Sequence, residues 1–464
     1  MVNNGNTNNH KMIRWKSNGS LLTLAFLYVV FTAIAQTARG QSDNTGNTTN
    51  TETLNGTTQL TDALNNFGYK LSLQLLKDSN NTNIVLSPTG INGLLAMALL
   101  GSVGKSYDEL SDKLGFSQDV LANRYNHEQL GNLLEELNSN ETYSKTLYAD
   151  AVFVDINYKL REVYRSYLSK VYHGASISVD FRDSEAVKAT INDWVYNNTN
   201  GNLDTFLKDA LPMDTKIALL SALYFSGQWE VPFLVEHTKK FPFTTALGQE
   251  VQVDQMLNLG LFKYAYSKDD GFEMLALPYN DSVTTLYAVK PRFPTKTSLL
   301  EILNSIDYLK INNLISQMVP TECVIRFPKM DLTSDLKLEK TLKELGIKSI
   351  FSPEEANFAL LVDENIKTNA IEEELIQRIN AGDVDSHLQS FIDRLPNPRL
   401  YVDTVLHSVK IRIDEYGTEA SAASGAFLAR TAQIFYLNSP FYMFIRNEKT
   451  QLVTFSAVIN DPNI

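Results

Sequence analysis

The stretch Glu415-Tyr-Gly-Thr-Glu-Ala-Ser-Ala-Ala-Ser-Gly-Ala-Phe-Leu-Ala-Arg430 decides how this 464-residue sequence is interpreted. Its alanine-rich composition alone favours a short surface helix or a flexible linker. Written as a strand, however, it carries only small or apolar side chains on one face, because side chains alternate between the two faces of a strand. The residues of that face are Thr418, Ala420, Ala422, Ser424, Ala426 and Leu428.

This alternation allows the stretch to occupy two environments. It can be solvated as a loop, or it can be buried as an additional strand of a sheet. Between Thr418 and Leu428 the only charge, on Glu419, falls on the opposite face, so burial of the small face puts no charge into a core. Gly417 at the base adds the backbone freedom that such a change needs.

The rest of the chain predicts one large α+β domain over residues 59–464. Apolar residues have helical spacing from about Leu60 to Leu137, where Ser87-Pro88 reads as a helix start. Later residues alternate helical stretches, 161–172 and 336–345, with β-rich runs. Those runs are 151–154, 218–225, 274–277, 324–327 and 409–413.

The N-terminus differs from the domain. Basic residues precede an apolar run over 21–34, which is shorter than the roughly 20 residues that a spanning helix needs. This pattern predicts a signal peptide over residues 1–35 and a secreted protein. Residues 36–58 are rich in Asn and Thr and almost free of apolar side chains, so they predict a disordered polar arm.

Charge and cysteine content exclude several classes of protein. The formal net charge is −12, and loss of the basic leader makes it more negative, so nucleic acid and anionic membrane surfaces are not expected partners. Cys323 is the only cysteine, so no internal disulfide can form. Its strand-like surroundings predict a buried hydrophobic side chain.

Sequence motifs of enzymes are missing. No His-x-x-x-His or Cys-x-x-Cys spacing predicts a metal site, and the chain has no Gly-x-Ser-x-Gly, phosphate-binding or dinucleotide-binding motif. We therefore expect a monomer that is not an enzyme and needs no cofactor. Glycosylation sequons, which suit a secreted protein, occur at Asn47, Asn55, Asn80, Asn140, Asn197 and Asn280.

Ordered blocks spread over residues 60–464 resemble the serpin family of serine protease inhibitors. The blocks are Asn83-Ile-Val-Leu-Ser-Pro88, Ile191-Asn-Asp-Trp-Val195, Thr199-Asn-Gly201, Ala222-Leu-Tyr-Phe-Ser-Gly-Gln-Trp229, Leu277-Pro-Tyr279, Phe327-Pro-Lys329, Leu345-Gly-Ile347 and Pro440-Phe-Tyr-Met-Phe-Ile-Arg446. The resemblance implies three β-sheets, about nine helices and an exposed reactive-centre loop over 415–436. It also implies that a protease cleaves this loop and that the cut loop inserts into the main sheet.

The resemblance assigns roles to particular residues. The hinge of inhibitory members is matched by Glu415, Gly417, Thr418, Ala420, Ser421, Ala422, Ala423 and Ser424. Carriers and storage proteins of the family place bulky or charged residues there. Trp229 and His407 match the pair near the top of the main sheet where insertion begins. The alternative interpretation is that both are ordinary packing residues.

Two positions remain possible for the scissile bond. Arg430-Thr431 suits a trypsin-like protease, and Arg430 is the only basic residue between Arg412 and Arg446. Counting the family's usual spacing from Glu415 gives Thr431-Ala432 instead. A trypsin-like serine protease is therefore the expected covalent partner, and a non-inhibitory carrier, storage or binding protein is the alternative function.

The chain also departs from the family pattern. Ser221 stands where asparagine is usual, Gly90 where serine is usual and Ser456 where glycine is usual, so the ease of insertion stays open. Residues 363–399 form an insertion that reads as a helical hairpin, expected at the pole opposite the loop, where it is either a surface addition or a docking site for a partner. Residues 105–137 carry several acidic residues and no basic stripe, so heparin is not expected as an activator.

Overall fold

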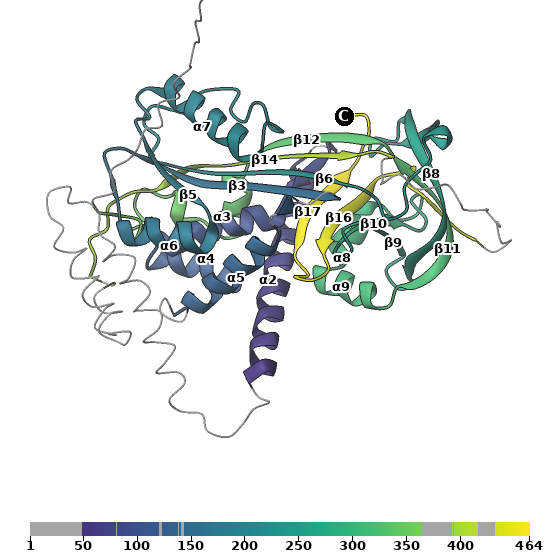
Figure 1. The fold of residues 1–464 in the computed structure, drawn as a ribbon, viewed down its shortest axis with the longest axis horizontal. Helices are drawn as coiled ribbons and strands as arrows, with labels where there is room; N and C mark the ends of the chain where they lie inside the picture. Colours follow the sequence, from purple (N-terminus) through teal and green to yellow (C-terminus); the bar gives the residue numbers. More distant parts are fainter. Residues whose placement is uncertain are drawn as a thin grey trace, which may run out of the picture.

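The structure is a computed structural model that describes residues 49–79, 81–119, 123–137, 139–140, 143–363, 392, 394–415 and 432–464. Within these residues the chain forms nine α-helices and seventeen strands (Figure 1). The helices are α2 (Thr49–Asp78), α3 (Pro88–Gly101), α4 (Lys105–Leu114), α5 (Asn123–Leu137), α6 (Glu162–Tyr172), α7 (Ser184–Asn198), α8 (Leu299–Ser305), α9 (Tyr308–Ser316) and α10 (Glu339–Glu344).

The strands of the described residues form three sheets. The six-stranded sheet has the order β12 (Met330–Lys337), β14 (Val402–Ile413), β6 (Ile217–Gly227), β3 (Ser144–Asp155), β2 (Ser139–Asn140), with β5 (Ala175–Val179) beside β3. The nine-stranded sheet has the order β1 (Ile84–Leu86), β17 (Val453–Ile459), β16 (Phe441–Asn447), β10 (Thr284–Pro291), β9 (Phe272–Pro278), β8 (Glu250–Ser267), β11 (Val319–Pro328), β15 (Gln433–Tyr436), with β7 (Lys239–Thr244) beside β8. The two-stranded sheet pairs β13 (Val362–Asp363) with β4 (Lys159–Leu160).

The six-stranded sheet is covered on both faces, which explains why its central strands are apolar at consecutive positions. Leu219 of β6 packs into the cluster formed with α2 and α3, whereas the next residue, Leu220, packs into the cluster formed with α7. Successive side chains on a strand point to opposite faces, so β6 needs apolar residues at both parities. Figure 1 shows α7 on one face of this sheet and the helices from α3 to α6 on the other.

The two larger sheets pack against each other at one end of the molecule. The C-terminal ends of β6 and β14, called the upper end of this strand pair below, include Phe225 and Ile411. These residues share a buried cluster with Phe262 of β8 and Phe327 of β11. Figure 1 shows β8 and β11 at the end opposite to α4 and α6. The core is therefore continuous from the helical end to the sheet-on-sheet end.

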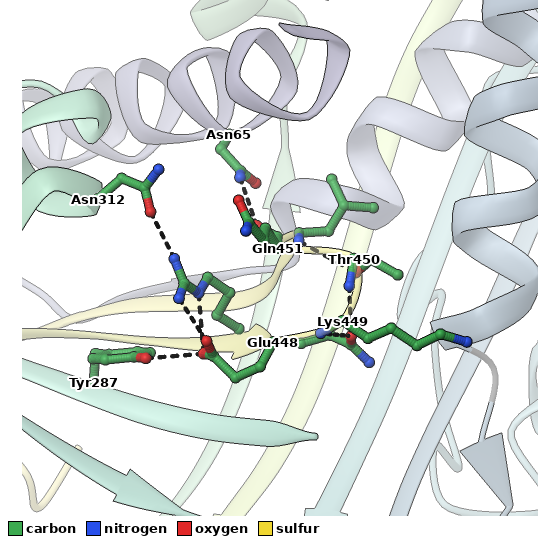
Figure 2. A network of polar contacts seen from close by, with 10 residues as sticks. Asn65, Tyr287, Asn312, Glu448, Lys449, Thr450 and Gln451 are labelled. Atoms are coloured by element: carbon green, nitrogen blue, oxygen red, sulfur yellow. Dashed lines mark hydrogen bonds and ion pairs between the residues drawn. The ribbon is translucent and has the colours of Figure 1, made fainter. Parts of the chain in front are cut away.

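A polar network ties the turn between β16 and β17 to two helices (Figure 2). Arg446, which is 5% exposed, donates through Nε and Nη2 to both oxygens of Glu448 and through Nη1 to Asn312 of α9 at 2.7 Å. Asn65 of α2 donates to the Gln451 carbonyl and accepts from the Val453 amide. A bidentate arginine–carboxylate pair fixes both distance and orientation, so the turn is held in one place.

Most elements predicted from the sequence are confirmed. The fold is α+β with three sheets, and the five predicted β-rich runs lie within β3, β6, β9, β11 and β14. Ser87 is the N-cap of α3 and accepts from the Gly90 amide, with Pro88 at the first helical position, as predicted. Cys323 is 2% exposed, which confirms it as a buried side chain.

Two predicted boundaries are wrong. Helix α2 begins at Thr49, so residues 49–58 of the predicted polar arm are helical. Once a helix is nucleated by its buried part, each added residue gains a hydrogen bond, so polar residues can extend it. Residues 336–337 end strand β12, and α10 begins only at Glu339, because Leu336 pairs across the sheet with His407. Cross-strand pairing here overrides local helix propensity.

Several predictions lie partly or wholly outside the described residues. The signal peptide over 1–35 is one of them, and most of the 363–399 insertion is another. The insertion leaves the fold at Asp363 of β13, and the chain enters β14 at Val402, at the end of that strand opposite to Glu415. No helix within the described residues is long and apolar enough to span a bilayer.

Candidate functional site

The central pair of the six-stranded sheet, β6 and β14, runs parallel. Val402 pairs with Ile217 at one end and Ile411 pairs with Phe225 at the other. Each strand has an antiparallel neighbour on its far side, β3 for β6 and β12 for β14. A strand that ran back from the end of β14 at Glu415 would be antiparallel to both, so this pair is the one place in the sheet centre where such a strand fits.

Trp229 anchors the upper end of the pair. It follows β6, is 3% exposed, and its indole Nε1 donates to the Asp414 carbonyl at 2.8 Å, just beyond the end of β14. Its ring stacks on Tyr279 with centroids 4.4 Å apart and lies edge-on to Phe233. Trp229 thus joins the ends of the two strands by a hydrogen bond and by buried aromatic area.

Glu415 is the last described residue before the predicted loop, and its carboxylate is fully engaged. Oε2 accepts from Nζ of Lys329 at 2.7 Å, and Oε1 accepts from the Thr238 hydroxyl at 2.7 Å. Burial raises the pKa of Glu415, but the hydrogen bonds from Lys329 and Thr238 more than offset this, so the pKa lies below its usual value. The base of the loop therefore has a fixed, charged anchor.

Three polar residues lie in one row across the middle of the sheet. Asp150 of β3 pairs with Ser221 of β6, and Ser221 pairs with His407 of β14. Within the described residues, Oδ1 of Asp150, Oγ of Ser221 and Nδ1 of His407 are buried without a hydrogen-bond partner. A buried polar atom that lacks a partner destabilises the folded state, so this row weakens the sheet between its strands.

His407 is neutral and accepts one hydrogen bond from the start of α3. Its Nε2 accepts from the Ser87 amide at 2.8 Å, which places the ring proton on Nδ1. Burial lowers the pKa of His407 to about 3, although the backbone of Ser221 acts in the opposite direction. Ser87 in turn donates its hydroxyl to the Thr454 carbonyl of β17, so His407 is linked to the nine-stranded sheet.

Asp150 brings an acidic group to the same row. Burial raises the pKa of Asp150 to about 7, and the nearby Ser221 hydroxyl lowers it in part, although the geometry between the two falls short of a hydrogen bond. Helix α3 lies close to Ser221. A Cβ added to Gly90 of this helix would be only 2.9 Å from Oγ of Ser221. Only small side chains have room between α3 and this part of the sheet.

The lower end of the pair is bridged by the segment that connects α7 to β6. Asp403 of β14 accepts from the amides of Lys216 and Ile217 at 2.5 and 3.2 Å. Lys208 forms an ion pair with Asp335 of β12 at 2.9 Å. A cavity of about 430 Å³ lies between this segment and strands β12 and β14. These contacts join the β6 side of the sheet to the β14 side.

The structure separates the two residues that were predicted to act as a pair. His407 lies opposite Ser221 in the middle of the sheet, whereas Trp229 lies beyond the end of β6. From Ser221 to Gly227 the strand advances about 20 Å, at roughly 3.3 Å per residue. Trp229 contacts the end of β14 and His407 contacts the start of α3, so each residue serves a different part of the strand pair.

The remaining predicted site residues are only partly visible. Glu415 is described, whereas Gly417 to Ser424, Arg430 and Thr431 lie outside the described residues. Among the sequons, Asn197 is exposed on the last turn of α7, and Asn280 follows β9. Thr199 of the Asn197 sequon is buried and its hydroxyl donates to the Val195 carbonyl at 2.8 Å. Asn55 and Asn140 lie in α2 and β2, while Asn47 and Asn80 lie outside the described residues.

Sequence reasoning missed Asp150, Lys329 and Thr238 as parts of the site. Asp150 had a usable signal, because within β3 its carboxyl lies between two apolar residues, Ala149 and Ala151. Lys329 had a signal only as part of the block Phe327-Pro-Lys329, and Thr238 had none, because both reach Glu415 only through the packing of distant segments.

The comparisons with known proteins agree with this geometry. The family model described as Serpin (serine protease inhibitor) matches residues 62–462. Serine protease inhibitor 28Dc of Drosophila melanogaster is 27% identical over 83% of this chain and 76% of its own length. The structure of native protease nexin-1 with heparin is 25% identical, has a TM-score of 0.71, and is matched over 87% of this chain and 99% of that chain.

A structure of thyroxine-binding globulin with thyroxine has a TM-score of 0.72 at 20% identity, over 87% of this chain and 99% of that chain, which shows the shared fold alone. The family match, by contrast, spans nearly all of the described domain, including the parallel strand pair and both ends of the predicted loop. The chain belongs to the serpin family of serine protease inhibitors.

Proposed function

We propose that this protein is a secreted suicide inhibitor that traps a trypsin-like serine protease as a covalent complex. The observation that carries the proposal is the parallel pairing of β6 and β14, directly after which the chain enters a segment with one small-residue face. Insertion of that segment would replace one parallel pair by two antiparallel pairs. The additional hydrogen bonds would supply the free energy that holds the protease.

The chemistry requires only the first half of a normal proteolytic reaction. The protease serine attacks the carbonyl carbon of Arg430 and gives up its proton to the protease histidine. The bond to the Thr431 nitrogen then breaks, and that nitrogen leaves as an amine after it takes the proton from the histidine. An ester then joins Arg430 to the protease. If residues 418–428 insert before water reaches this ester, the protease is carried along the sheet and its catalytic geometry is disturbed.

The middle of the sheet suits an entering strand of small residues. Helix α3 leaves little space over Ser221, as the position of Gly90 shows, so bulky side chains on that face of a new strand would clash. The face formed by Thr418, Ala420 and Ala422 meets this requirement. The row with unpartnered atoms of Asp150, Ser221 and His407 lies where the two strands would separate.

The anchor at Glu415 defines where insertion starts. Its bonds to Lys329 and Thr238 keep the end of β14 fixed while the residues after it turn back into the sheet. Gly417 supplies the backbone freedom for this turn. Opening would also break the bond from Trp229 to Asp414 and the bridge between Lys208 and Asp335.

The remaining features of the proposal follow from the sequence. A signal peptide over 1–35 and the sequons support secretion and glycosylation, and therefore control of an extracellular proteolytic cascade. We expect a monomer whose reaction is independent of heparin. Helix α5 carries a single basic residue, Arg124, and this side chain is already paired with Glu128 at 3.0 Å.

The deciding experiment mixes the purified protein with trypsin and follows the products by denaturing gel electrophoresis. A band of the combined mass that resists SDS supports the proposal. Thr418→Arg places a charge on the face that would be buried when the loop inserts. This variant should be cut as a substrate without forming a complex. Cleavage of the wild type without any complex would instead favour the alternative, a non-inhibitory carrier, storage or binding protein.

The same reaction identifies the scissile bond. Amino-terminal sequencing of the released C-terminal fragment should begin at Thr431 if Arg430 is recognised. A fragment that begins at Ala432 would assign the bond to Thr431-Ala432. The cleaved protein should unfold at a markedly higher temperature than the native protein, because its sheet has gained a strand.

A further inference from the structure

The outer face of β8, β11 and β15 carries a continuous apolar strip. Leu259, Val324 and Ile434 pair in register and form one row across the three strands. Leu257 and Leu261 lie two residues to either side of Leu259 and point to the same face. We call these five residues, Leu257, Leu259, Leu261, Val324 and Ile434, the apolar strip.

The opposite face of the same strands is already occupied by the core. Phe262, Cys323 and Phe435 alternate with residues of the apolar strip and are all buried. Antiparallel sheets that face water usually carry polar residues on the outer side. Here Leu261 is 66% exposed and Ile434 is 55% exposed. Contiguous apolar surface of this kind marks a site of interaction.

Charged residues border the strip. Glu322 pairs with Leu261 across the strands. At the other end, the Arg326 guanidinium lies between the rings of Phe241 and Tyr436, with its Cζ 3.6 and 4.4 Å from their centroids. This stacking fixes the position of the charge. An apolar centre with a polar rim is the usual anatomy of a protein interface.

The strip lies next to the segment that a protease would cleave. Ile434 is three residues beyond Thr431, so their Cα atoms are at most about 11 Å apart. Neighbouring strands are about 4.8 Å apart, which puts Val324 and Leu259 about 5 and 10 Å further on. A standard interface covers about 800 Å² on each partner, equivalent to a disc of about 16 Å radius. A protease that holds Arg430 therefore has Ile434, the end of the strip nearest the loop, within the reach of a standard interface.

We propose that the apolar strip is a docking surface for the body of the target serine protease, outside its substrate cleft. The proposal rests on the function proposed above, because it takes the protease to be the occupant. The matching protease surface is apolar at its centre and carries an acidic group opposite Arg326. Contact with the strip selects the protease before the bond is cut, so it acts on the rate of association and not on loop insertion.

The test uses the full-length double variant Leu261→Thr/Ile434→Thr. Threonine has a β-branched side chain that suits a strand, and it removes most of the exposed apolar area at both positions. The matched control is Ile156→Thr/Met213→Thr, which changes two residues of similar exposure, 55% and 65%, near the opposite end of β6. Both variants should keep the far-UV circular dichroism and the unfolding temperature of the wild type.

Association rate constants are then measured with trypsin, thrombin and plasmin. For the protease that reacts fastest with the wild type, the strip variant should react about tenfold more slowly, as expected when an interface loses central apolar contacts. The control should react at the wild-type rate, and the number of inhibitor molecules consumed per trapped protease should stay the same in all three proteins.

Three results would overturn the assignment, and they are distinguishable. Equal rates for the strip variant and the control remove the docking surface but leave the proposed function intact. A wild type that sediments as a dimer, with the strip variant as a monomer, identifies a second copy of the chain as the occupant. If the wild type neither traps nor is cut by any of the proteases, the proposed function fails and the docking surface loses its partner.

Discussion

The two ends of one strand pair differ from its middle. At the upper end of β6 and β14, Trp229 donates to Asp414, and Glu415 is bonded to Lys329 and Thr238. In the middle of the same pair, the described neighbours of Ser221 leave its hydroxyl unpartnered, together with one nitrogen of His407. Satisfied buried groups stabilise a structure, and unsatisfied ones destabilise it.

This difference indicates where strands β6 and β14 resist separation from each other. The upper end combines an ion pair, a stacked tryptophan and a buried cluster, so it holds the strands together in the native state. Separation of the strands costs less free energy in the middle, because the unpartnered polar groups there can bond to water or to new partners on opening. The described contacts therefore hold this strand pair more firmly at the end near Glu415 than in its middle.

Removing the aromatic anchor should have the largest effect. Trp229→Ala deletes a side chain that is 3% exposed, together with its bond to Asp414, and should lower the free energy of unfolding by about 3–5 kcal/mol. Urea unfolding followed by far-UV circular dichroism measures this loss. Trp229→Phe should lose less, since it keeps part of the stacking on Tyr279. Equal losses in the two variants would argue against a role for the ring area.

Breaking the ion pair at the base of the loop should have an intermediate effect. Lys329→Gln leaves the Glu415 carboxylate, which is 3% exposed, without its cation. Because Lys329 is itself 39% exposed, we expect a loss of about 1–2 kcal/mol in unfolding free energy at pH 7. Glu415→Gln added to this variant should restore part of it.

The pH dependence of this pair has a definite sign. The pKa of Glu415 is depressed in the folded protein, so its stabilisation is present above the unfolded pKa of about 4.5 and is lost as the pH falls through the lower folded value. The difference between the wild type and Lys329→Gln should therefore shrink in acid. A difference that is constant from pH 7 to pH 3 would contradict the assignment.

The buried carboxyl in the middle should give the opposite slope. The pKa of Asp150 rises from 3.8 to about 7, so the folded state binds the proton more tightly and Asp150 favours folding increasingly as the pH falls from 7 to 4. His407 and His127, with pKa values of about 3, act against it in the same range. Asp150→Asn removes only the first contribution.

Urea midpoints at several pH values measure this contribution. Asp150→Asn should be more stable than the wild type at pH 8, and this advantage should diminish as the pH is lowered to 5. Parallel curves for the two proteins would show that Asp150 titrates with an ordinary pKa. The result sharpens the contrast with Glu415, whose stabilisation changes in the other direction with pH.

The smallest effect is expected at the exposed bridge between the two sides of the sheet. Lys208→Met removes the ion pair with Asp335, but the Lys208 side chain is 75% exposed. The urea unfolding midpoint should therefore change less than in Trp229→Ala, Lys329→Gln or Asp150→Asn. Lys337→Met, on the rim of the same cavity, is the matched control. A large loss that is specific to Lys208→Met would mean that this bridge, and not the upper end, holds the sheet closed.

The sequence predicted the helices and strands better than it predicted which residues from distant segments lie side by side. The helix start at Ser87-Pro88 and the strand at 218–225 follow from local chemistry, namely a capping hydroxyl and a run of apolar residues. The row of Asp150, Ser221 and His407 joins residues from three distant segments, and no local pattern specifies that register. The start of α2 at Thr49 was missed for a related reason, since the buried part of the helix extends it into polar residues.

The separation of Trp229 from His407 along the sheet has a physical explanation. Both residues belong to the same sheet, but order along the chain does not give position along a strand. His407 is separated from the end of β14 by residues 408–413, and only the register with β6 shows that it lies opposite Ser221. The apolar strip had a signal in the sequence, because leucine recurs at every second position over 257–261.

The buried hydroxyl of Thr199 has a consequence for the order of events during synthesis. An enzyme that reads the Asn197 sequon has to reach this hydroxyl, which in the folded protein donates to Val195 and accepts from the Leu203 amide. Modification of Asn197 would therefore compete in time with closure of the turn after α7. A glycan found at Asn197 would show that it was attached before this turn closed. The fraction of chains that carry it would then report how fast the turn folds relative to glycosylation.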